Sequence, residues 1–136
     1  MEIFDPLRKK YVKQTPEETV RQNVIQWLSA SIGVPMTHMM SEVAFTFNGL
    51  QYRADIVVYD KQLKPLMFVE CKAPDIPIDN IVIDQCIRYF QVLKVEYILT
   101  TNGKTSYLCS WNPEKQQFEF IRECPDYQKM LVGREL

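Results

Sequence analysis

Residues 53–59 (RADIVVY) and 66–72 (LMFVECK) are two short, mostly apolar runs separated by a polar turn. Runs of this kind are typical of buried strands. An acid interrupts each run, at Asp55 in the first and at Glu70 in the second. Because side chains alternate along a strand, Glu70 and Lys72 point to the same face of the sheet. If the two strands pair, we expect Asp55, Glu70 and Lys72 to meet at one edge of that sheet.

Such a grouping predicts a metal site. Two carboxylates held close together repel each other unless a cation lies between them, and oxygen ligands suit Mg²⁺ or Mn²⁺. A neighbouring Lys72 can then help to activate a water or stabilise developing negative charge. The simpler alternative is that Asp55 and Glu70 face water at strand ends and that Lys72 only forms a salt bridge with one of them. The Glu-x-Lys spacing on one face favours the functional interpretation.

The remaining pattern places these strands inside a larger α/β fold. A helix is expected from Thr15, which can cap it, through Pro16 and Glu18. Asn48-Gly49 predicts a two-residue hairpin turn. A second helix is expected over residues 79–94, and a terminal helix or tail from about residue 125. The expected strands cover residues 43–47, 52–59, 66–71, 96–101, 106–111 and 117–121. Helix, three strands, helix and further strands predict a sandwich with a mixed central sheet flanked by helices.

The length of 136 residues fits one domain. Residues 1–14 are expected to form an extended amino-terminal arm that packs loosely or contacts a partner, and residues 15–136 a single domain. Trp27 and Trp111 are expected in the core.

Composition excludes several classes of site and location. The net charge of −1 means that nucleic-acid binding would need a local patch, a metal ion or a partner. The four cysteines form no Cys-x-x-Cys pair, which argues against zinc and fits reduced thiols in a cytoplasm. His38 is the only histidine, so a histidine-based centre is nearly excluded. The sequence contains neither a signal peptide nor a membrane-spanning stretch.

The two predicted helices carry further candidate site residues. Glu17 lies in phase with the apolar stripe of the first helix and should face the body of the protein, whereas Glu18 should face solvent. For either acid alone, favourable charge at a helix N-terminus is the simpler explanation. Gln85 and Tyr89 are four residues apart and share one face of the second helix, where they form either part of a site or an ordinary amphipathic boundary. Two arginines, Arg53 and Arg88, are candidate phosphate contacts, although an ordinary surface charge is the simpler explanation for each.

Four pieces of the chain resemble the PD-(D/E)xK nuclease superfamily, and within it the N-terminal nuclease domain of type I restriction enzyme R subunits. They are residues 16–22 (PEETVRQ), 53–57 (RADIV), 69–74 (VECKAP) and 85–89 (QCIRY). The proline that usually precedes the first acid is replaced by Ala54. The resemblance implies a restriction-endonuclease-like fold.

The resemblance also implies an activity and its residues. The activity would be Mg²⁺- or Mn²⁺-dependent hydrolysis of DNA. Asp55, Glu70 and the backbone carbonyl of Cys71 would hold the metal, and Lys72 would assist the attacking water. Glu17 is carried over as an outer-sphere or direct ligand of the metal, with Glu18 as the fallback. Gln85 and Tyr89 are implied to contact DNA or to steady the lysine.

The sequence leaves partners and one other function open. No motor is encoded in these residues, so the chain would act alone, as a homodimer, or with separate restriction or motor subunits, or it would be a fragment of a longer protein. The alternative function is a nucleic-acid-binding or assembly module that has kept the fold and little activity. A purely structural domain would require all four matches to be accidental.

Overall fold

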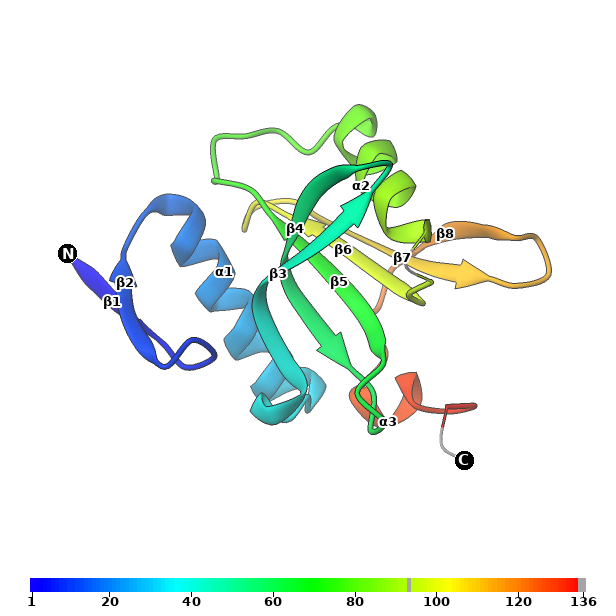
Figure 1. Cartoon of the computed structure of the whole chain (residues 1–136), viewed down its shortest axis with the longest axis horizontal. Helices are drawn as coiled ribbons and strands as arrows, with labels where there is room; N and C mark the ends of the chain where they lie inside the picture. Colours follow the sequence, from blue (N-terminus) through cyan, green and yellow to red (C-terminus); the bar gives the residue numbers. More distant parts are fainter. Residues whose placement is uncertain (93, 135–136) are drawn as a thin grey trace.

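The computed structural model describes residues 1–92 and 94–134 and shows an α/β fold built on a six-stranded sheet (Figure 1). The strands lie in the order β3-β4-β5-β6-β7-β8. All neighbours are antiparallel except β5 and β6, which are parallel and connected through α2. The sheet is therefore mixed, as predicted. The elements are β1 (Glu2–Asp5), β2 (Lys10–Lys13), α1 (Pro16–Trp27), the π-helical turn η1 (Leu28–Ile32), the 3₁₀ turn η2 (Met36–His38), β3 (Met39–Phe47), β4 (Leu50–Tyr59), β5 (Pro65–Cys71), α2 (Asn80–Val92), β6 (Tyr97–Thr101), β7 (Ser106–Asn112), β8 (Gln117–Ile121) and α3 (Tyr127–Met130).

Local sequence signals set the element boundaries. Thr15 caps α1 by accepting a hydrogen bond from the Glu18 backbone N–H at 3.1 Å, and Pro16 occupies the first turn. Asn48 and Gly49 adopt φ values of 52° and 76°. Positive φ at both central residues is what a type I′ hairpin turn requires, so the turn between β3 and β4 lies where it was predicted.

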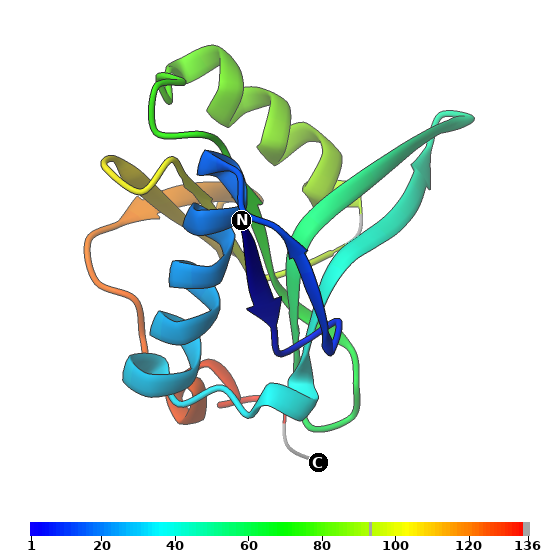
Figure 2. The same cartoon turned by 90° about the vertical axis from the view of Figure 1, so that its left-hand side faces the viewer.

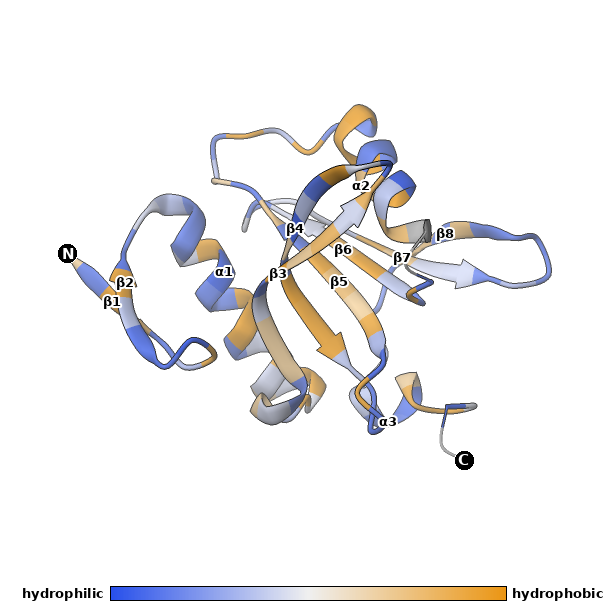
Figure 3. Ribbon diagram, viewed as in Figure 1, coloured by the Kyte–Doolittle hydropathy of each residue, from blue (hydrophilic) through white to orange (hydrophobic). Residues whose placement is uncertain are grey.

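The sheet separates two hydrophobic cores, one under each main helix. The core on the α1 side includes Ile25, Leu28, Ile56 and Val69, and the core on the α2 side includes Val57, Phe68, Phe90 and Ile98. Figure 3 shows the apolar residues concentrated on the central strands. No described helix is long and apolar enough to cross a membrane.

Residues 1–14 do not form the expected extended arm; β1 and β2 pair as an antiparallel hairpin. Figure 2 shows this amino-terminal hairpin in front of the sheet and beside α1. Polar contacts hold it there: Asp5 is fully buried and accepts a hydrogen bond from the Leu7 backbone N–H at 2.8 Å. Arg8 forms an ion pair with the same carboxylate.

The connection from β5 to α2 is tied to the end of β6. The Lys72 backbone N–H donates to the Thr101 carbonyl at 2.8 Å. The buried Asn102 side chain donates to the Ile76 carbonyl at 2.7 Å, and its amide oxygen accepts from the backbone N–H groups of residues 104 and 105. Thr101, at the end of β6, and the next residue, Asn102, therefore hold the loop at its start and in its middle.

Candidate active site

The two acidic strands pair as the sequence predicts. β4 and β5 are antiparallel, with Ile56 opposite Val69, so the next position in this register holds Asp55 and Glu70. The Lys72 ammonium nitrogen lies 3.5 Å from Glu70 Oε1. Both acids and the lysine thus meet at the carboxyl end of β5. The prediction that these three residues converge is confirmed.

The regular alternation of side chains between the two faces of the sheet is interrupted in β4 at Asp55. Ala54 belongs to the core on the α2 side, whereas Ile56 and Val58 belong to the core on the α1 side. In a regular strand, residues two apart share a face. The β3–β4 ladder also omits the position of Asp55 and its opposite residue Glu42, and Glu42 has a left-handed φ of 53°. Irregularities of this kind re-aim side chains next to active sites, and the Asp55 side chain contacts Arg21 of α1.

Two donors hold the Asp55 carboxylate. Arg21 Nη2 donates to Oδ1 at 3.1 Å, and the Cys71 backbone N–H donates to Oδ2 at 2.6 Å. Arg21 lies on α1 with its side chain 8% exposed, and its Nη1 also contacts Glu18 at 3.2 Å and Glu42 at 3.3 Å. Its buried Nε has no hydrogen-bond partner within residues 1–92 and 94–134. Asp55 therefore has a fixed orientation and a positive counter-charge.

The two helix-borne acids lie the other way round from the prediction. Glu18 is buried and accepts hydrogen bonds from Arg8 at 2.7 Å, Arg21 and Gln22, whereas Glu17 is exposed. The apolar stripe misled the phase argument because α1 also buries the polar face that carries residues 18, 21 and 22. The assignment of Glu17 or Glu18 as a metal ligand stays a prediction.

The pKa values of both carboxyl groups are raised. Burial raises the pKa of Glu70 to about 7; the charge of Asp55 adds to this, and Lys72 opposes it. Burial also raises the pKa of Asp55, against the hydrogen bond from Cys71 and the charge of Arg21. Glu17 contributes to the raised pKa of both groups, so its charge reaches the site although the residue is exposed. Neighbouring acids with raised pKa values are typical of functional sites.

The donor set suits a hard divalent cation. Asp55 and Glu70 supply oxygen atoms, and a carboxylate that accepts two hydrogen bonds keeps further lone pairs. The described residues contain no group of three or more Asp, Glu, His or Cys side chains arranged to hold a metal ion. Mg²⁺ is commonly bound through one or two carboxylates and keeps several waters, so the pair fits Mg²⁺ better than a metal that needs a full protein cage.

A cleft of about 150 Å³ opens next to these residues. Glu70 and Lys72 line one side, and Gln85 and Tyr89 from α2 line another. The prediction that these two α2 residues face the same cleft as Lys72 is confirmed. Tyr89 packs on Tyr52 of β4, with ring centroids 4.2 Å apart. Arg53 also lines the cleft, whereas the second candidate phosphate contact, Arg88, is an exposed residue of α2.

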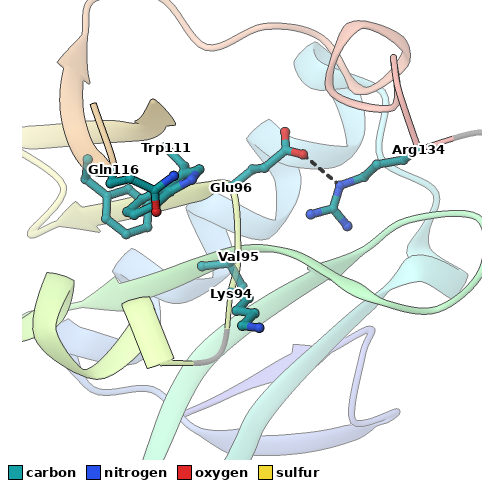
Figure 4. A pocket seen from close by; sticks show the side chains of 7 residues that line it. Lys94, Val95, Glu96, Trp111, Gln116 and Arg134 are labelled. Atoms are coloured by element: carbon teal, nitrogen blue, oxygen red, sulfur yellow. Dashed lines mark hydrogen bonds and ion pairs between the residues drawn. The ribbon is translucent and has the colours of Figure 1, made fainter. Parts of the chain in front are cut away.

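A larger hollow of about 520 Å³ lies at the opposite end of β6 (Figure 4). Its lining includes Trp111, Gln116 and an ion pair of Glu96 with Arg134 at 3.0 Å. The two charged groups neutralise each other, and this hollow adds nothing to the acidic site. Trp111 and Trp27 are only half-buried, so they are less central than the sequence analysis expects.

Arg21 and Glu42 were not identified as site residues from the sequence. Arg21 lies within one of the resembling segments, and its place one turn after two acids on a helix was a usable signal. No sequence pattern marks Glu42 as a site residue, because its contacts with Arg8, Arg21 and Arg53 depend on tertiary structure and on its unusual backbone conformation.

Comparisons with known proteins agree with this fold. A fragment described as a putative HsdR subunit of a type I restriction enzyme from Vibrio vulnificus YJ016 superimposes with a TM-score of 0.61 at 20% identity, over 88% of this chain and 26% of that one. A putative nuclease belonging to DUF820 from Anabaena variabilis ATCC 29413 superimposes with a TM-score of 0.51 at 14% identity, over 85% and 74%. The chain thus spans about a quarter of the first protein. These likenesses establish a restriction-endonuclease-like fold.

A comparison with curated protein sequences gave no match. A family model matches residues 16–125, which is most of the chain, and it describes the N terminus of the type I restriction enzyme R protein. All four segments singled out from the sequence lie within the matched range. The chain therefore belongs to the type I restriction enzyme R protein N-terminus family.

Proposed function

We propose that this domain is a Mg²⁺-dependent endonuclease that hydrolyses phosphodiester bonds in DNA. The observation that carries the proposal is the pairing of buried Asp55 with half-buried Glu70, with the Lys72 ammonium group 3.5 Å from Glu70 and an open cleft lined by Glu70 and Lys72. A divalent ion bound to the pair would supply a water of lowered pKa and would offset the charge of the phosphate.

The roles of the protein groups follow from their positions. Arg21 and the Cys71 N–H keep the Asp55 carboxylate in one orientation. Lys72 uses one of its three N–H donors on Glu70 and keeps the others for an oxygen on which negative charge develops. Gln85 and Arg53 present further donors to the cleft, where they can contact phosphate oxygens and hold the strand.

A second candidate function is a nucleic-acid-binding or assembly module with little activity of its own. The observation that favours it is that Arg21 and Cys71 already engage both oxygens of Asp55. In this reading Arg21 takes the place of a cation, and the cleft binds a strand without cutting it.

One experiment separates the two functions. Linear, circular and single-stranded DNA are incubated with the purified chain, with and without Mg²⁺ or Mn²⁺. We expect metal-dependent cleavage that is lost in Asp55→Asn and Glu70→Gln and retained in Glu123→Gln, a matched change at an exposed acid. Binding without cleavage under every metal condition would instead favour the second function.

A further inference from the structure

The amino-terminal hairpin is the positively charged part of an otherwise acidic chain. Residues 1–14 contain four of the 16 Lys and Arg and two of the 17 Asp and Glu, so this segment carries a net +2 and residues 15–136 a net −3. Lys9, Lys10 and Lys13 are exposed. Within the described ranges, none of the three lies within ion-pairing distance of a carboxylate. Their charges are therefore available to an external anion.

The same hairpin exposes two aromatic rings. Phe4 and Tyr11 are cross-strand partners and are 47% and 67% exposed. Their ring centroids lie 5.2 Å apart in an edge-to-face arrangement, so they form one small aromatic surface. Lys13 and Glu2 form the pair two positions further along the same face. Exposed aromatic rings among unpaired lysines match what proteins use to bind single-stranded nucleic acid.

The hairpin is also attached to the active site. Arg8 lies in its turn and contacts Glu18 at 2.7 Å and Glu42 at 3.5 Å. Both acids contact Arg21, which in turn holds Asp55. This chain of ion pairs fixes the hairpin beside the helix that supports the catalytic acid. A ligand bound to the hairpin would therefore lie next to the proposed site of cleavage.

We propose that the amino-terminal hairpin binds a single-stranded stretch of DNA adjacent to the active site. Lys9, Lys10 and Lys13 contact its phosphates, and Phe4 and Tyr11 stack on unpaired bases. Bases within a duplex already stack on one another, so the exposed rings select single-stranded DNA. This inference rests on the proposed action on DNA, and it names the form of the substrate.

The first test measures the salt dependence of binding in EDTA, where no cleavage occurs. Fluorescence anisotropy with a labelled oligothymidylate gives the affinity at several NaCl concentrations. Each phosphate contact to a single strand contributes a slope of about −0.7 in log K against log salt. We expect Lys9→Gln/Lys10→Gln/Lys13→Gln to reduce the slope by about 2. The control is Lys64→Gln/Lys115→Gln/Lys129→Gln, three exposed lysines elsewhere, and it should leave the slope unchanged.

The second test concerns the rings. Stacking of one base on an aromatic ring contributes about 1–3 kcal/mol, so Tyr11→Ala should weaken oligothymidylate binding roughly 5- to 150-fold. Tyr11→Phe keeps the ring and should bind like wild type, and both variants should have wild-type circular dichroism. Duplex DNA of the same length should bind more weakly than the single strand and should not respond to Tyr11→Ala.

The outcomes separate this inference from the proposed function. Wild-type protein that binds the single strand through the hairpin and cuts nothing would leave the inference standing and refute the nuclease. Equal slopes and affinities for wild type and the hairpin variants would overturn the inference, whether or not the protein cuts DNA. Absence of nucleic-acid binding, or hairpin variants that lose only a protein partner, would also overturn it.

Discussion

Arg21 Nη2 and Asp55 Oδ1 lie 3.1 Å apart, and this contact joins α1 to the middle of β4 across 34 positions of sequence. Both side chains are largely buried, at 8% and 12% exposure. Burial by itself would lower the pKa of Arg21, but the charges of Asp55 and Glu18 overcome this effect and raise it. The guanidinium therefore stays charged, and it is a permanent counter-charge for the acid proposed to bind metal.

Removal of Arg21 should destabilise the fold. In Arg21→Gln, Asp55 and Glu18 would lose a shared buried partner, and breaking a buried ion pair typically costs about 3–5 kcal/mol. Urea unfolding at pH 7 measures the loss. Arg53→Gln is the control, because its side chain is 62% exposed and contacts Glu42 at 3.5 Å; a change within about 0.5 kcal/mol is expected there. Similar losses in both variants would contradict the central role of Arg21.

The helix-borne acid can be identified by metal titration. Titration calorimetry with Mn²⁺ should show a site in wild type that Asp55→Asn lacks. Glu17→Gln should weaken this binding, because the charge of Glu17 reaches both Asp55 and Glu70. Glu18→Gln should chiefly lower stability, because Glu18 is already occupied by Arg8, Arg21 and Gln22. Loss of Mn²⁺ binding in Glu18→Gln with normal binding in Glu17→Gln would reverse this assignment.

Glu70 should make the metal-free protein less stable as the pH rises. Its pKa is about 7 in the fold against an ordinary 4.5, so between these values the folded state keeps a proton that the unfolded state has lost. The contribution of Glu70 to the free energy of unfolding therefore falls as the pH rises from 4.5 to 7, by up to about 3 kcal/mol in total.

The Glu70→Gln variant isolates this effect. It should be more stable than wild type at pH 8 and similar to it near pH 4.5, as measured by urea unfolding in EDTA. Saturating Mg²⁺ should reduce the difference at pH 8, because a bound cation favours the ionised carboxylate. A constant difference between the two proteins across this range would show that Glu70 titrates normally.

Removal of the Lys72 side chain should lower the rate of DNA cleavage without changing metal binding, because an ammonium group donates hydrogen bonds and does not ligate Mg²⁺. Lys72→Ala should slow DNA cleavage roughly 100- to 1,000-fold and keep Mn²⁺ affinity near that of wild type. Lys72→Arg should also be slow, because the guanidinium is larger and planar. Cleavage by Lys72→Ala at the wild-type rate would refute the proposed mechanism even if the fold is right.

The meeting of Asp55, Glu70 and Lys72 was predictable from sequence because each step follows from local rules. Alternation fixes which residues share a face, and the short turn between the strands fixes their antiparallel pairing. Asn48-Gly49 located the preceding hairpin for the same reason. These features depend on neighbours in the chain, which the sequence displays directly.

The polar face of α1 was not predictable in this way. Hydrophobic periodicity identifies a buried face only when that face is apolar, and here Glu18, Arg21 and Gln22 are buried by pairing with one another and with distant acids. The amino-terminal hairpin was missed for a related reason, since Arg8 in its turn is held by Glu18 and Glu42, which are distant in the sequence. In both places long-range charge pairing decides the structure.

The double attachment of the β5–α2 loop has a consequence for the timing of substrate recognition. Thr101 holds Lys72, and Asn102 holds Ile76, so the end of β5, which Lys72 directly follows, and the helix that carries Tyr89 are joined through one short, anchored segment. The two walls of the cleft are therefore tied to each other through backbone and side-chain hydrogen bonds. Preorganisation of this kind lowers the entropic cost of aligning a strand, so the proposed nuclease would receive its substrate in a cleft whose walls are already held.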